Sequence, residues 1–99
     1  MLARTPEFCA DEIGLLCSMH AGTFPGELPA RESVASCRLY LPILEDVCRS
    51  DPPRGRRLLE RIHAIPEEGC FERVPERVQQ AVGGITYAMH RALEQHPPR

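Results

Sequence analysis

Ninety-nine residues are enough for one domain and too few for two. Hydrophobic residues make up 42% and charged residues 26% of the chain, which is typical of a globular protein and excludes wholesale disorder. No apolar run approaches the roughly 18 to 20 residues that span a membrane, and the start lacks the apolar core of a secretory signal. Twelve basic residues against fourteen acidic ones give a net charge of −2, which argues against a dedicated nucleic-acid binder. We therefore expect a cytoplasmic protein with no membrane contact.

Capping residues and prolines divide the chain into helices. Thr5 stands where the first helix begins, and Asp51 stands where the third begins. The expected helices cover about 6–20, 30–49, 52–65 and 75–95. No segment has the two-residue alternation of a strand. The sequence thus predicts an all-α fold, a single helical domain over 1–99 built as a bundle of about four helices, with frayed ends at 1–4 and 96–99.

The expected second helix has apolar side chains on two sides. One row, with the heptad spacing typical of helix packing, consists of Val34, Cys37, Leu41, Leu44 and Cys48. A row on the other flank consists of Ser36, Tyr40, Ile43 and Val47, and Leu39 extends it. We assign the heptad row to the core and the second row to a protein partner, because an aromatic ring with a polar tip tolerates intermittent exposure. Pro42 lies on the remaining polar side, where water can satisfy the freed carbonyl of Arg38, so a kink is predicted rather than a break.

The expected last helix carries a second heptad row and a strip of small side chains. The row consists of Val78, Val82, Ile85, Met89 and Ala92, and the strip of Ala81, Gly84, Ala88 and Ala92. Small side chains let another helix backbone approach closely. We therefore expect Val82, Ile85, Ala88 and Met89 to pack against another helix, in this chain or in a second copy. A homodimer or a covering partner is favoured over the alternative of a self-contained core.

A basic cluster near the start of the third helix supports an alternative function. It consists of Arg54, Arg56, Arg57 and Arg61. Backbone N–H groups at a helix start also favour anions, so these residues are candidate anion-binding residues of a small nucleic-acid-associated protein. The competing interpretation is a solvated helix face, since no helix-turn-helix spacing precedes the cluster. Direct nucleic-acid binding is therefore not the favoured hypothesis.

Five cysteines are the other candidates for chemistry, and none belongs to a CxxC pair: Cys9, Cys17, Cys37, Cys48 and Cys70. We expect free buried thiols in a reducing cytoplasm, with a disulfide between heptad-row cysteines as an alternative. Cys17 and His20 are three positions apart on one helical face, which is half of a zinc site that lacks two ligands. No nucleophile with its base and no phosphate loop is indicated, so we expect no enzyme, cofactor or metal.

Two stretches carry a family resemblance. SVASCRLYLPILEDVCRS (33–50) and VPERVQQAVGGITYAMHRALEQ (74–95) resemble the small helical antiactivators of quorum sensing in Gram-negative bacteria. The resemblance implies a non-enzymatic bacterial homodimer that binds the ligand-binding domain of a LuxR-type transcription regulator and blocks its dimerisation or its binding to DNA. Spacing and composition do not indicate that partner, and a phage-encoded inhibitor or a secretion chaperone has the same helical pattern.

Overall fold

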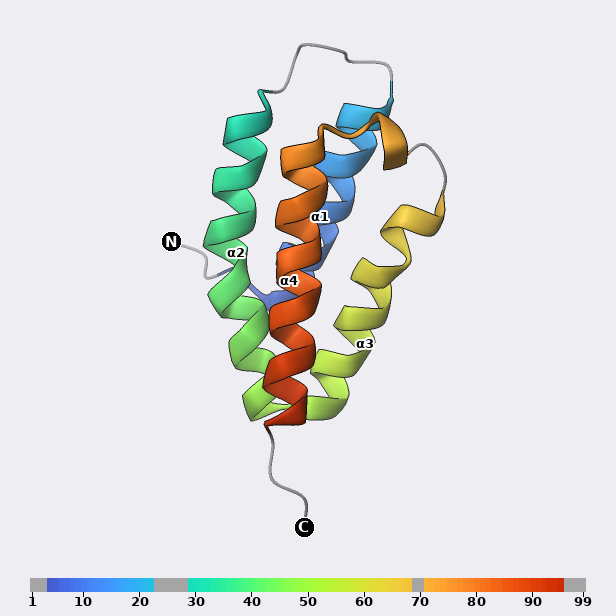
Figure 1. Cartoon of the computed structure of the whole chain (residues 1–99). Coiled ribbons are helices and arrows are strands. Elements are labelled where there is room, and N and C mark those ends of the chain that lie inside the picture. Colours follow the sequence, from blue (N-terminus) through green and yellow to red (C-terminus); the bar gives the residue numbers. More distant parts are fainter. Residues whose placement is uncertain (1–3, 23–28, 69–70, 96–99) are drawn as a thin grey trace.

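The computed structural model describes residues 4–22, 29–68 and 71–95. Its elements are α1 (Pro6–Ala21), α2 (Ala30–Ser50), α3 (Pro52–His63), the 3₁₀ turns η1 (Ile65–Glu68) and η2 (Phe71–Arg73), and α4 (Glu76–Glu94). These described ranges contain no strand, and the predicted all-α bundle with four main helices is confirmed (Figure 1). Apart from Arg4, the predicted frayed ends lie outside the described residues.

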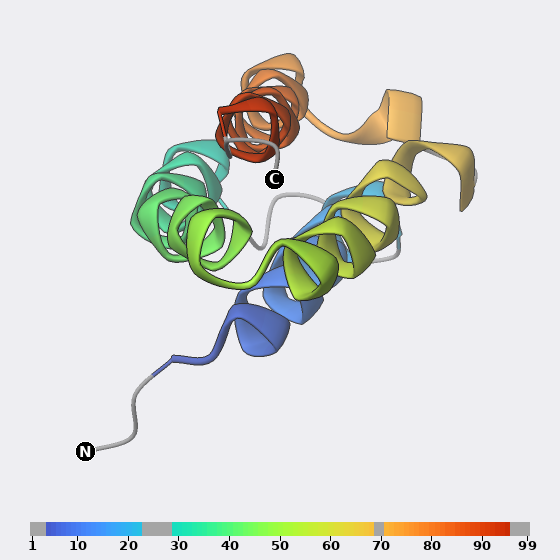
Figure 2. The same ribbon diagram turned by 90° about the horizontal axis from the view of Figure 1, so that it is seen from below.

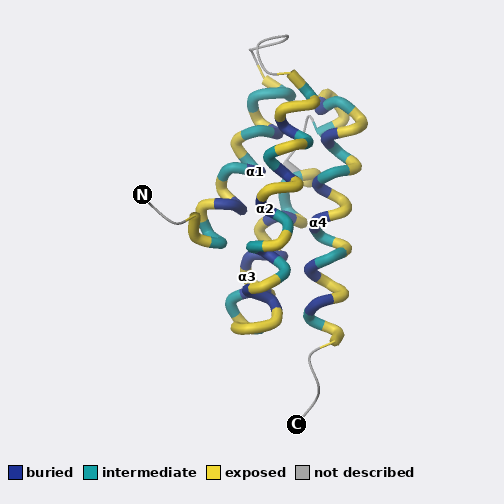
Figure 3. Tube along the Cα trace, turned by 90° about the vertical axis from the view of Figure 1, so that its left-hand side faces the viewer, coloured by how far each residue is buried: buried dark blue, intermediate teal, exposed yellow. Residues whose placement is uncertain are grey.

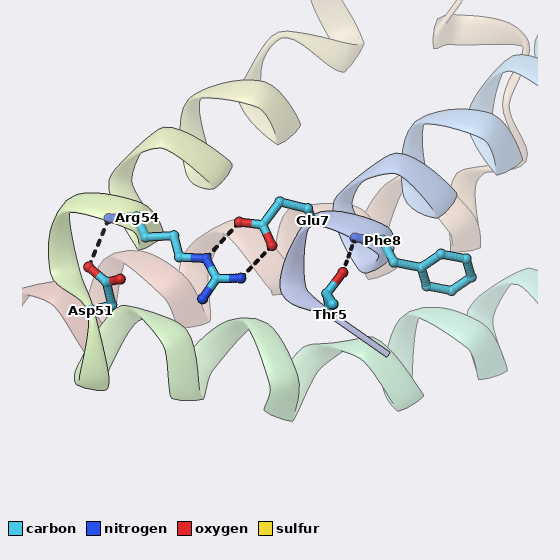
Figure 4. Close-up of polar contacts among 5 residues, drawn as sticks. All are labelled: Thr5, Glu7, Phe8, Asp51 and Arg54. Atoms are coloured by element: carbon cyan, nitrogen blue, oxygen red, sulfur yellow. Dashed lines mark hydrogen bonds and ion pairs between the residues drawn. The ribbon is translucent and has the colours of Figure 1, made fainter. Parts of the chain in front are cut away.

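Short-range hydrogen bonds fix where two of the helices begin. The Thr5 hydroxyl accepts a hydrogen bond from the backbone N–H of Phe8 at 3.0 Å, which caps α1. The Asp51 carboxylate accepts one from the backbone N–H of Arg54 at 3.4 Å, which caps α3 (Figure 4). Because Asp51 alone separates α2 from α3, the chain reverses abruptly and α3 returns beside α2.

α2 is the central helix of the bundle. α1 and α3 run in one direction, and α2 and α4 run in the other (Figure 1). α2 packs against all three other helices, and its contact with α4 is the most extensive in the bundle. Seen from below, α4 lies over α2 and α3, with α1 on the far side (Figure 2). α2 therefore has one inner side and two flanks, one bordered by α1 and the other by α4.

The buried stripe of α2 differs in phase from the predicted heptad row. It consists of Ser33, Cys37, Tyr40, Leu44, Val47 and Cys48. The assignment of the heptad row to the core is right for Cys37, Leu44 and Cys48, whereas Val34 and Leu41 are only half-buried and pack at the edge of the core. The reason is that α1 and α3 both pack against α2, with Phe8 of α1 in contact with the Tyr40 ring.

The heptad row of α4 is buried as predicted. Its members Val78, Val82, Ile85, Met89 and Ala92 all lie in the core. Buried residues alternate with exposed ones along each helix, as expected when one face of a helix packs inward (Figure 3). α2 continues through Pro42, which is exposed, and the lower half of α2 leans toward the start of α3 (Figure 1). The helix thus survives its internal proline as predicted.

Gly55 allows α3 to approach α2 closely. A Cβ atom at this position would lie 2.7 Å from the Cα of Cys48 and 2.8 Å from its Sγ. Both distances are shorter than packed carbon and sulfur atoms adopt, and the closer neighbour is backbone. Gly55 is therefore the residue that lets the α2–α3 turn close.

We predict that Gly55→Ala destabilises the protein by about 1 to 3 kcal/mol, because the added methyl group forces α3 away from α2. Gly83→Ala is the matched control, since a Cβ on Gly83 meets nothing within 4 Å. The control should stabilise the protein by about 0.5 to 1 kcal/mol, the gain in helix propensity from glycine to alanine. Urea unfolding followed by circular dichroism measures both. Equal effects of the two substitutions would contradict the close approach at Gly55.

Candidate protein-interaction surfaces

Three large apolar side chains of α1 and α2 are exposed. Phe8 is 43% exposed, Leu15 is 52% exposed and Leu39 is 49% exposed. Phe8 and Leu15 are seven positions apart, which places them on one flank of α1 two turns from each other. We refer to Phe8, Leu15 and Leu39 as the α1/α2 patch.

Ion pairs on α1 show which way the α1/α2 patch faces. Glu7 and Asp11 each pair with an arginine of α3, so their flank of α1 faces α3. Leu15 is four positions from Asp11, or about 40° around the helix, so Leu15 lies on the outer side of α1, next to the flank that faces α3. Phe8 lies close to the same outer side, and its ring contacts Tyr40 of α2. Phe8 thus connects the patch to α2, and the α1 part of the patch belongs to the helix that lies opposite α4 in the bundle (Figure 2).

Phe8 connects the two helices of the patch by its contact with Tyr40. The two rings meet edge to face, with centroids 6.4 Å apart and an angle of 87° between their planes. The guanidinium carbon of Arg4 lies 5.9 Å from the centroid of the Tyr40 ring. Burial raises the pKa of Tyr40, so its phenol stays protonated at neutral pH. Since Leu39 adjoins Tyr40 in the chain, this contact holds the α1 and α2 parts of the patch together.

The structure corrects two of the four residues predicted to bind a partner. Tyr40 is 5% exposed and Val47 is 4% exposed, so both belong to the core of the monomer. The prediction that they face outward is wrong, because both belong to the hydrophobic core and Phe8 of α1 packs against Tyr40. Leu39 is exposed and Ile43 is half-buried, so these two remain at the surface.

A second surface feature lies on the other flank of α2, between α2 and α4. It is a groove of about 570 Å³ lined by Arg31, Val34, Cys37, Arg38 and Leu41 of α2 and by Arg77, Gln80, Ala81, Gly84 and Ile85 of α4. We refer to these ten residues as the α2/α4 groove. Its charged lining residues are all arginine, and its remaining lining is mostly apolar. The half-burial of Val34 and Leu41 results from their position in this groove.

The residues of α4 that were expected to pack against a helix divide into two groups. Val82, Ile85 and Met89 are buried within the chain, where they serve helix packing in the monomer. Ala88 is half-buried beside them. Of the small-residue strip, Gly84 lies open, since a Cβ atom on it would meet nothing within 4 Å. Ala81 and Gly84 of the strip therefore line the α2/α4 groove, whereas Ala92 lies in the core.

Two of the four arginines of the basic cluster form ion pairs with α1. Arg54 donates two hydrogen bonds to Glu7, from Nε at 2.6 Å and from a terminal nitrogen at 2.5 Å (Figure 4). Arg61 donates one hydrogen bond to Asp11 across the same two helices. Arg56 and Arg57 are exposed. Two of the four predicted anion-binding residues thus already neutralise carboxylates, which leaves a weaker site for phosphate than the sequence indicated.

The cysteines and His20 lie where packing explains them. Cys9, Cys17, Cys37 and Cys48 are buried free thiols, and Cys70 lies outside the described residues. Burial raises the pKa of Cys17 and that of Cys37 to about 11, so both thiols stay protonated. His20 Nε2 lies 2.8 Å from the Ser33 hydroxyl, which links α1 to α2, and burial lowers the pKa of His20. Within the described ranges no three His, Cys, Asp or Glu side chains are grouped to hold a metal ion.

The structure also shows a histidine pair that the sequence did not reveal. The Nε2 atoms of His63 on α3 and His90 on α4 lie 3.0 Å apart, and their rings meet at 63°. One ring donates the hydrogen bond and the other accepts it. The two residues are 27 positions apart, and no local signal joins them. The pair is a polar link between the two helices at the surface.

None of the protein-family models, curated proteins or solved structures compared with the chain matches it. In the part of the chain that the structure describes, no helix combines the length and the apolar character needed to cross a bilayer. Function is therefore inferred from the two surfaces that flank α2, the α1/α2 patch and the α2/α4 groove.

We predict that Glu7→Gln weakens the pH dependence of stability between about pH 5 and pH 2. The hydrogen bonds from Arg54 lower the pKa of Glu7 from 4.5 to about 2 in the folded protein. The carboxylate therefore stabilises the fold above pH 4.5, and this contribution disappears as the pH falls toward 2. Solvent screens the pair, since both side chains are more than a third exposed, so we expect a small effect.

Urea unfolding midpoints measured across this pH range provide the test. The wild-type midpoint should fall more steeply on acidification than the midpoint of Glu7→Gln. Glu94→Gln is the control, because Glu94 is exposed and forms no ion pair with a described residue. Parallel curves for the wild type and Glu7→Gln would show that the Arg54 contact does not stabilise the fold.

Proposed function

We propose that this protein is a non-enzymatic regulator that binds a protein partner through the α1/α2 patch. The supporting observation is that Phe8 and Leu15 on one side of α1, and Leu39 next to the Tyr40 that Phe8 contacts, are each about half exposed. In the described ranges, Tyr87 is the one other large apolar side chain that is strongly exposed. Single exposed apolar residues are ordinary, whereas a group of them is typical of a protein interface.

Acidic side chains around the patch indicate the chemistry of the partner. Glu12 lies between Phe8 and Leu15 on α1, close enough to act on the pKa of Tyr40. Glu32 and Asp46 are exposed, and each lies seven positions from Leu39, on the same flank of α2. A partner surface with apolar side chains surrounded by basic ones would complement this arrangement, since opposite charges at an interface rim favour encounter and orientation.

The finer proposal is an antiactivator of a LuxR-type quorum-sensing regulator. Its support is the resemblance of 33–50 and 74–95 to the small helical antiactivators, and these stretches largely coincide with α2 and α4. The first stretch carries Leu39 and Ile43, the two predicted partner-binding residues that remain at the surface. In this proposal the chain acts in the bacterial cytoplasm. It binds the ligand-binding domain of the regulator and prevents the regulator from dimerising or from binding DNA.

The alternative function, nucleic-acid association through Arg54, Arg56, Arg57 and Arg61, receives less support. Arg54 and Arg61 pair with carboxylates of α1, and such a carboxylate competes with a phosphate for the same guanidinium. The net charge of −2 also opposes attraction to a polyanion. No observation favours this alternative over protein binding.

We predict that Leu39→Glu removes repression while the fold is kept. In a host that carries a LuxR-type regulator and a fluorescent reporter on its target promoter, the wild-type chain should lower fluorescence. Leu39→Glu should weaken binding to the purified ligand-binding domain at least about tenfold, because a charge replaces a central apolar contact. Circular dichroism of the variant should match the wild type, since Leu39 is about half exposed.

Tyr87→Glu is the matched control for this experiment. Tyr87 is 63% exposed on α4, outside the patch, so its replacement introduces the same charge on another surface. Repression by Tyr87→Glu should equal that of the wild type. If the wild-type chain leaves the reporter unchanged, the LuxR-type partner is wrong. If Leu39→Glu and Tyr87→Glu lose repression equally, the α1/α2 patch is not the binding surface.

We also predict a homodimer at micromolar concentration. The row Val82, Ile85 and Met89 is used inside the monomer, so we assign the contact with a second copy, in the absence of the regulator, to the exposed side chains of the α1/α2 patch. Light scattering should give twice the 11.1 kDa of one chain, and Leu39→Glu should give 11.1 kDa. A monomeric wild type would contradict the homodimer, and a dimeric Leu39→Glu variant would contradict its placement at the patch.

A further inference from the structure

The α2/α4 groove has an apolar floor that no part of the described chain covers. Val34 and Leu41 from α2 are half-buried there, and Ala81 from α4 is half-buried opposite them. Beneath them lie Cys37 and Ile85, which are buried. An apolar floor of this kind gains free energy when another apolar surface covers it.

The charged side chains that line the groove are all basic. Arg31 and Arg38 are seven positions apart, so they extend from one flank of α2 two turns from each other. Arg77 stands on the α4 side of the same groove. No ion pair joins any of the three to a described residue, although the chain has more acidic than basic residues. The groove is thus positively charged on a protein whose net charge is negative.

The small residues of α4 leave room for a helix backbone. A Cβ atom on Gly84 would meet nothing within 4 Å, and Ala81 one turn earlier carries a single methyl group. From Arg31 to Leu41 the groove follows eleven residues of α2, whose ends are about 15 Å, or nearly three turns, apart along the helix. This length suits a short helical segment better than a single side chain or a small metabolite.

We infer that the α2/α4 groove binds an acidic amphipathic helix of a protein partner, whose apolar side chains cover Val34 and Leu41 while its flanking Asp and Glu side chains pair with Arg31, Arg38 and Arg77. Helices that dock in grooves present apolar residues at positions i, i+3, i+4 and i+7. Arginine suits the carboxylates beside such a ridge, because its planar guanidinium binds a carboxylate through two hydrogen bonds. The groove and the α1/α2 patch lie on opposite flanks of α2, so this inference goes beyond the proposed function and does not depend on it.

Charge complementarity selects this occupant over two others. A nucleic acid would pair its phosphates with the arginines, but its backbone would leave the apolar floor uncovered. In a second copy of this chain, the outer strip of α1 with Phe8, Glu12 and Leu15 has the right chemistry. That contact would join two different surfaces, and such head-to-tail contacts lead to rings or open filaments rather than a simple dimer.

The test uses a fluorescein-labelled, helix-locked peptide of about 14 residues, four helical turns, with Leu at the heptad positions and Glu on both flanks. A twin peptide carries Lys in place of every Glu. The acidic peptide should bind the full chain with a micromolar dissociation constant in fluorescence anisotropy, and the twin should bind at least about tenfold more weakly. Raising the salt concentration from about 50 to about 500 mM should weaken binding of the acidic peptide severalfold, because exposed charge pairs are screened.

A pair of glycine variants locates the binding site. Gly84→Leu fills the groove, whereas Gly83→Leu adds the same side chain one position away, outside the lining, and a Cβ on either residue meets nothing within 4 Å. Gly84→Leu should weaken binding of the acidic peptide at least about tenfold, and Gly83→Leu should leave it unchanged. Arg38→Ala should weaken binding and reduce its salt dependence. Leu39→Glu should leave binding of the acidic peptide unchanged, because Leu39 is not part of the groove. A failure of this inference can therefore be distinguished from a failure of the proposed function.

Other outcomes would overturn the inference. Equal affinity for the acidic and basic peptides would show that the arginines do not select the occupant. Equal effects of Gly84→Leu and Gly83→Leu would place the peptide outside the groove. A labelled DNA duplex that binds the wild type more tightly than the acidic peptide, and loses binding in Arg38→Ala, would assign the groove to nucleic acid. Concentration-dependent assembly of the wild type that Arg38→Ala abolishes would assign it to a second copy of the chain.

Discussion

The burial of α2 by three neighbouring helices is the constraint on which the rest of the structure depends. Cys37, Leu44 and Cys48 can be removed from water only if α1, α3 and α4 all contact the inner side of this one helix. Close packing against α3 in turn requires the glycine at position 55. With the inner side fully used, the apolar side chains on the two flanks of α2 are left at the edges of the bundle, where they form surfaces for other molecules.

The two flanks of α2 differ in charge, which gives each surface its own specificity. On the α1 side, Glu32 and Asp46 accompany the exposed Leu39. On the α4 side, Arg31 and Arg38 accompany the half-buried floor of the groove. Like charges placed opposite each other at an interface are costly, so a partner suited to one flank is disfavoured on the other. One helix thus offers two separate interaction surfaces on a chain of 99 residues.

Much of the fold could be predicted from the sequence because its signals are local. Thr5 and Asp51 lie three residues before the N–H groups that they cap, and the row from Val78 to Ala92 repeats with the helical period. The candidate site was less predictable. Leu39 and Ile43 are at the surface as expected, but the exposure of Phe8 and Leu15 and the arginines of the groove were not singled out, since each belongs to a surface formed by two helices.

By itself the sequence determined about where the helices begin and end. It also determined that α2 has more apolar surface than one neighbouring helix can cover. Both follow from the sequence because caps, prolines and periodicity act within a few residues. Only the tertiary structure decided which row of α2 faces inward. Val34, Cys37 and Leu41 have the same heptad spacing as Cys37, Tyr40 and Leu44, and periodicity fixes spacing but not the direction in which a row points. The pairing of Arg54 with Glu7 was likewise decided by packing, because it joins residues 47 positions apart that meet only once α3 has returned beside α1.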